Sequence, residues 1–471
     1  MNRNNFLPHA ALAVVLILVA AFAGQVRNWR KHWRHKGRTI VAGVPMTPST
    51  LPDIKTVSGT KHSEIFVRFR AGVSESQIQS LTARLNDEVE DETESVSGLS
   101  LIEDEDGKAT AAVLAEYRAL PEVEYAEPIF EIHLEEATGS FKPVLPNDPR
   151  FTEQWALAND GQNGGTSGAD IKATGAWAET TGSRKVVVAV LDSGVDYTHP
   201  DLVNNIWKRP ENIKEYQDRN LGEVDDETGY DALENDGDPM DENGHGTHCA
   251  GIIGAEGGNN EGITGVNWTV QIMPLRFMDA NGSGTTKDAI EAINYVIDRR
   301  KAGVNVRVIS ASWGSTQKSR ALEDVIRKAY DAGILFVAAS GNSSVDADRQ
   351  PHYPSSYNIG NVIAVAALDR NDKLTSFSNY GLKSVHIGAP GKDILSTYLR
   401  HEFKESSGTS MATPVVAGVA ALVLANDPNM SVDELRKHLL ESVDKLPDLK
   451  TKLVTGGRIN AAKAVGGQWK M

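Results

Sequence analysis

The chain has 471 residues, of which 40% are hydrophobic, enough to bury the core of one large domain with smaller appendages. Its formal net charge of −15 at pH 7 argues against nucleic acid as a partner, because a polyanion would be repelled. A single cysteine, Cys249, excludes a framework of intrachain disulfides.

The first 60 residues predict a targeting segment and a linker. Residues 10–23 are all apolar and end in Ala21-Phe22-Ala23, a small-x-small pattern that favours signal-peptide cleavage. Because this stretch is shorter than a bilayer span, we predict a signal peptide over residues 1–23 and secretion to the extracellular space or the periplasm. Residues 24–60, with Pro45, Pro48 and Pro52, predict a linker.

A membrane-anchored protein is the alternative for this N-terminal segment. Secretion prefers positive charge before the apolar stretch, whereas here six basic residues follow it. They are Arg27, Arg30, Lys31, Arg34, Lys36 and Arg38.

Residues 61–135 predict a small module of alternating strands and helices. Strands are expected at 65–69, 98–102 and 123–130, and helices at 76–85 and 110–120. This order is typical of a small ferredoxin-like α+β fold. The pattern by itself fits an independent accessory domain as well as a propeptide. A loose segment, residues 136–146, separates the module from the rest of the chain.

Residues 147–466 predict an α/β domain with a doubly wound, mostly parallel sheet. Short apolar strands are expected at 185–191, 270–276, 306–310, 334–339 and 362–366, and they are too continuous for a sheet with one wet face. Helical patterns such as 287–301 lie between them. Sites in such sheets form at the carboxyl ends of strands, where Asp192 and Asn342 are expected.

A second helix is predicted to begin near Ser410, because apolar residues recur there every three or four positions. Pro414 must then lie in about the first turn. The hydroxyl and backbone N–H of Ser410 would lie at the positive end of the helix dipole, where an anionic intermediate is stabilised. An ordinary helix N-cap is the alternative for the same Gly-Thr-Ser sequence.

Four motifs together resemble the subtilisin-like serine peptidases, the subtilase family, from about residue 147 to about residue 465. They are Asp192-Ser193-Gly194, His245-Gly246-Thr247-His248, Ala339-Ser340-Gly341-Asn342 and Gly408-Thr409-Ser410-Met411-Ala412-Thr413-Pro414. The chain order Asp, His, Ser is the order known for subtilisin itself. The resemblance implies a secreted serine endopeptidase of broad substrate range that acts through an acyl-enzyme.

The resemblance assigns a chemical role to each residue of this set. His245 would take the proton of Ser410, and Asp192 would fix the tautomer of the imidazole and stabilise the imidazolium. Asn342 would donate its side-chain N–H to the oxyanion beside the backbone N–H of Ser410. A turn-forming Asp192 and a metal-binding His245 are the alternatives.

Two further residues on the expected helix after Gly244 lie close to His245 in the sequence. His248 is expected to be structural. Cys249 is expected beneath His245, as in proteinase-K-like members, so a mercurial would inactivate by displacement, although a buried small apolar residue is an equally good interpretation.

The resemblance also implies contacts with an extended peptide substrate. Ser312, Trp313 and Gly314 match one wall of the primary specificity pocket, and the opposite rim matches Gly282, Ser283 and Gly284. The residue before Tyr353-Pro354, another pocket segment, is His352, where the founding members carry glycine. We consider both a pocket-floor residue that favours acidic or polar side chains and a solvated loop histidine.

A structural calcium ion is expected from the resemblance. Asp148, Asp201 and Asn259 match the strong calcium site of the family, with Asn260 as the alternative to Asn259 because the loop is one residue longer. A second acidic stretch fits either a solvated loop or a further calcium site. It comprises Asp225, Asp226, Glu227, Asp231, Asp236, Asp238 and Asp241.

The module before the peptidase is then expected to be a propeptide, because its end, residues 121–128, is similar to the ends of subtilase inhibitor prodomains. It would assist folding, inhibit the active site and be cut off within residues 136–146. The partners expected are protein and peptide substrates and the chain's own propeptide, with no nucleic acid and no partner chain required.

Two other classes of function are considered. An α/β-hydrolase esterase needs Gly-x-Ser-x-Gly and places its Asp and His after the serine, whereas here Ala412 replaces the last glycine and only His438 follows Ser410. A catalytically silent peptide-binding protein on the same fold remains the alternative to the endopeptidase.

Overall fold

The computed structural model describes residues 63–92, 98–129, 144–218 and 222–466. The chain divides into two compact units, Met1–Thr138 and Gly139–Met471. The predicted signal peptide at 1–23, the linker at 24–60 and most of the segment at 136–146 lie outside the described residues.

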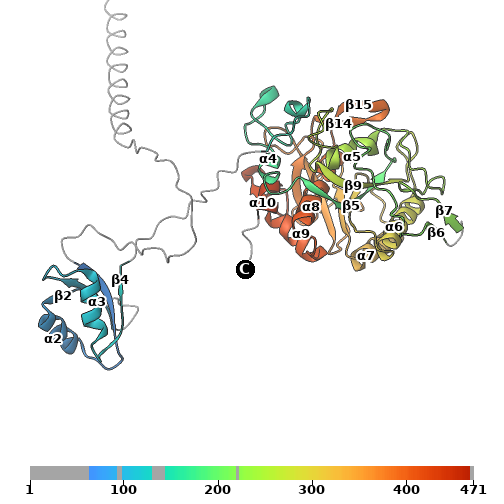
Figure 1. The fold of residues 1–471 in the computed structure, drawn as a ribbon. Helices are drawn as coiled ribbons and strands as arrows, with labels where there is room; N and C mark the ends of the chain where they lie inside the picture. The colour runs from blue at the N-terminus through green and yellow to red at the C-terminus, as the bar shows by residue number, and fades with distance from the viewer. Residues whose placement is uncertain (1–62, 93–97, 130–143, 219–221, 467–471) are drawn as a thin grey trace, which may run out of the picture. The chain divides into compact units, whose positions relative to one another are not determined.

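The first unit contains a four-stranded antiparallel sheet within its described residues, in the order β2-β3-β1-β4. Ile65, Val67 and Phe69 point to the face on which the two helices pack (Figure 1). This arrangement confirms the expected alternation of strands and helices. The elements are β1 Ser63–Phe69, α2 Glu75–Leu85, β2 Asp87–Glu92, β3 Leu99–Asp104, α3 Thr110–Arg118 and β4 Val123–Pro128.

The second unit is built on one large sheet, which in the described residues has nine strands in the order β16-β17-β13-β12-β11-β10-β5-β9-β8. All neighbouring pairs are parallel except β16 with β17. The strands are β5 Gly182–Asp192, β8 Tyr230–Asp231, β9 Thr269–Arg276, β10 Val306–Ala311, β11 Leu335–Ala339, β12 Val362–Leu368, β13 Ile387–Pro390, β16 Val443–Lys445 and β17 Gly457–Ile459. The five strands expected from the sequence are thus confirmed.

The remaining elements of this unit are helices, short turns and two hairpins. The helices are α4 Ala173–Ala176, α5 His245–Gly254, α6 Thr286–Lys301, α7 Arg320–Asp331, α8 Thr409–Asn426, α9 Val432–Glu441 and α10 Ala461–Val465. The 3-10 turns are η2 Phe151–Glu153, η3 Gln162–Gly164, η4 Leu399–His401 and η5 Pro447–Leu449. The hairpins pair β6 Tyr216–Asp218 with β7 Gly222–Val224, and β14 Ile394–Tyr398 with β15 Glu402–Ser406.

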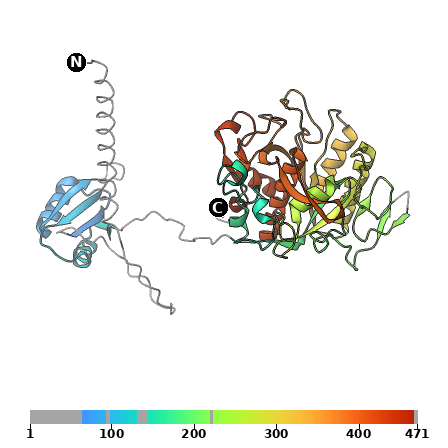
Figure 2. The same cartoon turned by 90° about the horizontal axis from the view of Figure 1, so that it is seen from above.

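Helices cover both faces of the large sheet, as Figures 1 and 2 show. Along β5, Val186, Val188 and Val190 pack with the residues of α8, whereas Val187 and Leu191 pack with those of α6 and α7. Because consecutive side chains of a strand point to opposite faces, this alternation buries both faces. The sheet is therefore doubly wound, as predicted.

Helix α8 is the central element of one helix layer. Of the described helices, it is the one long and apolar enough to cross a membrane, but 83% of the qualifying stretch is buried inside the domain. It is in contact with β5, β10, β11, β12 and β13. Its hydrophobicity is therefore that of a core helix.

The order in which strands are added to the sheet reverses at β5, although β5, β9 and β10 are all parallel. After β5 the chain forms β9 on one side, then crosses back to place β10 on the other side of β5. Ligands of open parallel sheets bind at such switch points, outside the carboxyl ends of the strands. Asp192 ends β5 and Ser312 follows β10, so both lie at this point.

Candidate active site

Asp192 and His245 are joined by a short hydrogen bond. Nδ1 of His245 donates to Oδ1 of Asp192 at 2.7 Å, and the Asp192 side chain is 1% exposed while that of His245 is 34% exposed. Burial lowers the pKa of His245, but the neighbouring Asp192 carboxylate and Cys249 raise it, and the resulting pKa lies well above its ordinary value. The other ring nitrogen, Nε2, is left for a second partner.

The position of His245 is set by the start of α5. Gly244, the N-cap, has φ of +97°, in the left-handed region that glycine adopts freely. The Asp241 carboxylate accepts from the backbone N–H groups of Asn243, Gly244 and Thr247, at 2.9 Å each. Asp241 is thus engaged as a helix cap, a role that our sequence analysis missed and that the Asp-x-Asn-Gly pattern could have revealed.

The loop after β5 lies in direct contact with α5. The Ser193 hydroxyl donates to Asp241 at 2.9 Å and accepts from the backbone N–H of Gly246 at 3.0 Å. A Cβ atom on Gly246 would lie 2.0 Å from the carbonyl oxygen of Gly194, closer than any side chain allows. The glycine after His245 therefore lets the helix approach the Asp192 loop.

Ser410 is the second residue of α8 and is fastened to Ser312. The Ser410 hydroxyl donates to the Ser312 carbonyl at 3.0 Å, and the Ser312 hydroxyl donates to the Ser410 carbonyl at 2.8 Å. Pro414, four residues after Ser410, has no N–H for the helical bond to that carbonyl. Proline at the sixth helical position, later than expected, thus leaves the Ser410 carbonyl free for Ser312.

Cys249 lies between the histidine and the serine. Its Sγ is 4.0 Å from Nδ1 of His245 and 3.6 Å from the carbonyl oxygen of Ser410. The structure therefore joins His245 directly to Asp192 and links it to Ser410 through Cys249, while the Ser410 hydroxyl is bonded to the Ser312 carbonyl. Burial raises the pKa of the Cys249 thiol, although the neighbouring His245 lowers it.

His248 has a structural position, as expected. Its Nε2 lies 3.1 Å from the carbonyl of Ile394 and 2.9 Å from that of Lys404, which ties α5 to the β14–β15 hairpin. Burial lowers its pKa to about 4, so the ring is neutral at physiological pH.

Asn342 and the start of α8 place two nitrogen atoms beside Gly408. Oδ1 of Asn342 accepts from the backbone N–H of Thr409 at 2.9 Å and from its hydroxyl at 3.0 Å, which turns Nδ2 outward. A Cβ built on Gly408 would lie 3.5 Å from Nδ2 of Asn342 and 3.5 Å from the backbone nitrogen of Ser410. Both nitrogens therefore border the same small space. Thr409, to which we gave no role from the sequence, orients the amide.

The residues expected to contact substrate lie on two rims near this space. Trp313 donates its indole N–H to the carbonyl of Leu191 at 2.9 Å and packs on Phe277, with ring centroids 4.9 Å apart, whereas Gly314 is exposed. The other rim, Gly282, Ser283 and Gly284, is exposed on a turn after β9. Asn243, two residues before His245, donates from its side chain to Ala280 of this turn at 2.9 Å.

The residues expected to hold calcium lie together. Asp148 is 4% exposed and Asp201 is 0% exposed, and Asp201 accepts from the side chain of Asn259 at 2.9 Å. Burial raises the pKa of Asp201 to about 7, and Asp148 and Glu261 add to this effect. Among the described residues, Oδ1 of Asp148 is buried without a hydrogen-bond partner. Two buried carboxyl groups, one of which has an oxygen without a hydrogen-bond partner, are suitable ligands for a hard cation such as calcium.

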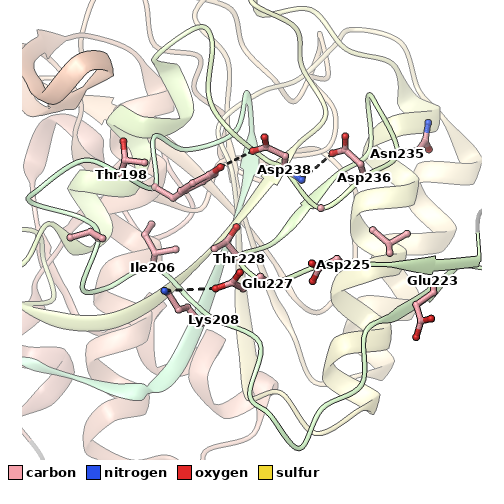
Figure 3. A pocket seen from close by; sticks show the side chains of 14 residues that line it. Thr198, Ile206, Lys208, Glu223, Asp225, Glu227, Thr228, Asn235, Asp236 and Asp238 are labelled. Atoms are coloured by element: carbon pink, nitrogen blue, oxygen red, sulfur yellow. Dashed lines mark hydrogen bonds and ion pairs between the residues drawn. The ribbon is translucent and has the colours of Figure 1, made fainter.

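The second acidic stretch divides between two environments. Asp226 is buried and paired with Arg209 and Arg299, so it belongs to a structural ion network. Asp236 and Asp238 instead line an open hollow of about 990 Å³, shown in Figure 3. The acidic stretch therefore contains both a buried residue in an ion network, Asp226, and residues that line an open hollow, Asp236 and Asp238.

Comparisons with known proteins match both units. Residues 183–458 match the subtilase family model, and residues 60–128 match that of the fervidolysin N-terminal prodomain. The chain belongs to the subtilase family. Its larger domain is that of a serine endopeptidase, and a prodomain precedes it in the same chain.

Several subtilases are similar to this chain. A thermophilic serine proteinase of Bacillus sp. (strain AK1) is 41% identical over 62% of this chain and 64% of the relative. Thermitase of Thermoactinomyces vulgaris is 37% identical over 68% of this chain and 99% of thermitase. The structure of a protease from Pseudoalteromonas arctica PAMC 21717 superposes with a TM-score of 0.57 at 29% identity, covering 69% of this chain and 99% of that one. These relatives are all proteases, which gives no support to the catalytically silent alternative.

Proposed function

We propose that Asp192, His245 and Ser410 are the catalytic triad of this subtilase. The supporting observation is the bond from Nδ1 of His245 to Asp192, which fixes the tautomer in which Nε2 accepts a proton. The Ser410 hydroxyl is bonded to the Ser312 carbonyl in this structure, and the proposal requires its side chain to rotate so that the hydroxyl reaches Nε2 of His245. Ser410 then attacks the peptide carbonyl while His245 takes its proton and passes it to the leaving amine.

The same proposal assigns the oxyanion site to Asn342 and Ser410. Their two N–H groups border one space beside Gly408, and neither has to be reoriented when negative charge develops on the substrate oxygen. Ser410 also lies at the N-terminus of α8, where the helix dipole favours an anion. Water then hydrolyses the acyl-enzyme by the same proton transfers.

We assign substrate binding to the two exposed rims. Main-chain groups at Gly314 and at Gly282–Gly284 would pair with an extended peptide as an added strand. Backbone pairing depends little on side chains, so the substrate range is broad.

We assign a structural calcium ion to Asp148, Asp201 and Asn259. The carboxylate oxygens of Asp148 and Asp201 are buried and would supply hard ligands, together with the side-chain oxygen of the partly buried Asn259, which accepts from the backbone N–H of Glu261 at 2.8 Å.

The precursor is proposed to mature by its own activity. The prodomain, residues 61–135, would inhibit the new active site until the chain is cut within residues 136–146, before the peptidase domain at 147–466. Secretion guided by residues 1–23 is proposed for the precursor, with membrane retention as the lesser alternative.

A fluorophosphonate probe tests the triad directly. The wild type should be labelled, and Ser410→Ala should not. Intact mass of the same two proteins tests processing: the wild type should begin near residues 136–147, and Ser410→Ala should remain a full precursor. Equal labelling of both proteins would overturn the assignment of Ser410.

A further inference from the structure

His352 fills the space between two backbone segments that flank Ser410. A Cβ atom on Gly314 would lie 2.1 Å from Cε1 of His352, and a Cβ atom on Gly341 would lie 3.0 Å from its Cδ2. The imidazole is therefore inserted between the segment that follows β10 and the one that follows β11. The ring is partly buried, which excludes the solvated loop histidine considered from the sequence.

The resemblance to subtilases implies that segment 312–314 is one wall of the primary specificity pocket, so this space is where we expect a substrate side chain. Strands β10 and β11 are parallel neighbours, so the segments after Ala311 and Ala339 leave the sheet side by side. One leads to Ser312, which is bonded to Ser410, and the other leads to Asn342. A peptide whose carbonyl reaches both Ser410 and Asn342 therefore directs the side chain before the scissile bond between these segments.

The imidazole is held firmly in this position. Tyr353, the next residue, exchanges two backbone hydrogen bonds with Ser315, at 2.7 and 2.8 Å. The Ser355 hydroxyl donates to the carbonyl of His352 at 2.7 Å and lies 3.5 Å from Nδ1 of the ring. The His352 imidazole would therefore block a long substrate side chain that enters this space.

We propose that His352 forms the floor of the primary pocket and shortens it, so that the enzyme cleaves after small residues such as alanine or serine in preference to leucine or phenylalanine. This inference rests on the proposed function, because it uses the assigned roles of Ser410 and Asn342. The proposed restriction applies only to the substrate residue before the scissile bond, and the substrate range stays broad at the other positions.

The ring acts through its size and not through its charge. Burial lowers the pKa of His352, so the imidazole is neutral at neutral pH and offers no cation to an acidic substrate side chain. The sequence-based expectation of a preference for acidic residues at this position is therefore not favoured.

Matched peptides that differ only in the residue before the scissile bond test the proposal. The mature wild-type enzyme should give a kcat/KM for alanine at least about tenfold above that for phenylalanine, since one methylene misfit in a pocket changes kcat/KM by about 10–200-fold. His352→Gly should invert this preference, whereas His352→Leu, which keeps the bulk, should retain it. A glutamate peptide should show no advantage with any of these enzymes.

His401→Gly is the matched control, because His401 is exposed and has φ of +62°, a conformation that suits glycine. It should leave all ratios unchanged. Each ratio is measured within one preparation, so a variant that folds less well still reports its preference. A wild-type preference for phenylalanine, or a ratio unaltered in His352→Gly, overturns the inference while hydrolysis continues. Absence of Ser410-dependent hydrolysis of every peptide would overturn the proposed function instead.

Discussion

Nδ1 of His245 is bonded to Asp192, and under the proposed mechanism this bond sets the pH dependence of hydrolysis. The charge of Asp192 holds the pKa of the imidazole well above its ordinary value against the opposing effect of burial. Because His245 must be neutral to accept the Ser410 proton, activity should rise as pH increases through this raised pKa.

Asp192→Asn tests this arrangement. Removal of the charge should lower kcat by about 10⁴-fold, because the imidazole loses its fixed tautomer, and should move the acidic limb of the kcat/KM profile to lower pH. The measurement is the pH profile of both enzymes on one peptide. An acidic limb at the same pH in both would contradict the role of Asp192.

Asn342→Ala tests the oxyanion site. It should lower kcat by about 10²–10³-fold, the size known for the equivalent donor in subtilisin itself, with little change in KM. The selective loss is expected because the donor acts on charge that develops only in the transition state. If KM rose while kcat stayed constant, Asn342 would be a binding residue instead.

The candidate residues could be predicted from the sequence because each lies inside a short motif. Of their supporting partners, Asp241 lies in an Asp-x-Asn-Gly pattern that could have revealed it, whereas Thr409 and the Ser312–Ser410 pair could not be predicted, since they act through hydrogen bonds between segments far apart in the sequence. Such bonds depend on where loops meet, and spacing alone does not encode this. Pro414 was noticed only as a boundary signal, although its missing N–H frees the Ser410 carbonyl.

At the scale of elements, the prodomain contains an unusual pair of buried acids. Asp87 in β2 lies opposite Asp104 in β3, and both are buried. Tyr117 of α3 donates to Asp87 at 2.7 Å, and Lys108 lies 4.0 Å from Asp104. Burial, with the nearby charge of Asp104, raises the pKa of Asp87 to about 6, although the Tyr117 bond and Lys108 lower it.

The stability of the prodomain should therefore depend on pH. A carboxyl with a raised folded-state pKa binds its proton more tightly when folded, so its stabilising contribution is complete below about 3.8 and is lost as pH rises through about 6. In the full-length Ser410→Ala precursor, the hydrogen-exchange protection factors of β1 to β4, which are corrected for the intrinsic base-catalysed exchange rate, should be lower at pH 8 than at pH 5.

Asp87→Asn should reduce this difference, because an amide does not ionise. Glu105→Gln, at an exposed position of the same module, is the matched control and should behave like the parent. Equal pH dependence in Asp87→Asn and in its parent would show that the buried acid is not responsible.

The sequence predicted every described prodomain element except β2. Its sequence Asp-Glu-Val-Glu-Asp-Glu has low strand propensity and no apolar alternation. The strand exists because β3 supplies a pairing edge, with Val89 opposite Ile102. Tertiary pairing therefore overrides local preference here, whereas the apolar strands of the large sheet were visible from their sequences.

At the scale of the whole molecule, the chain has no disulfide to stabilise it, since Cys249 is its only cysteine. The buried carboxyls Asp148 and Asp201 lie where the start of the domain meets the loop before β9: Gly258 donates to Asp148 at 2.7 Å, and Ile263 donates to Asp201 at 2.9 Å. An ion held there would fasten distant parts of the chain to each other.

Removal of calcium should consequently lower the melting temperature of the mature enzyme. A chelator should lower Tm by several degrees in the wild type, because binding to the folded state alone stabilises it. Asp201→Asn should have a lower Tm already and should respond little to added calcium, whereas Asp218→Asn, on the β6–β7 hairpin, should respond as the wild type does. Calorimetry with and without calcium provides the measurement. An identical response of Asp201→Asn and the wild type would place the ion elsewhere.

The position of Ser410 at the start of α8 has a kinetic consequence. Since most residues of that helix are buried, the proposed nucleophile is attached to a part of the fold that opens only when the domain unfolds. The activity that remains during storage or heating should therefore be proportional to the fraction of enzyme molecules that are still folded. Intact molecules should digest unfolded ones. Inactivation by autolysis should therefore accelerate with enzyme concentration and slow when a reversible inhibitor is present.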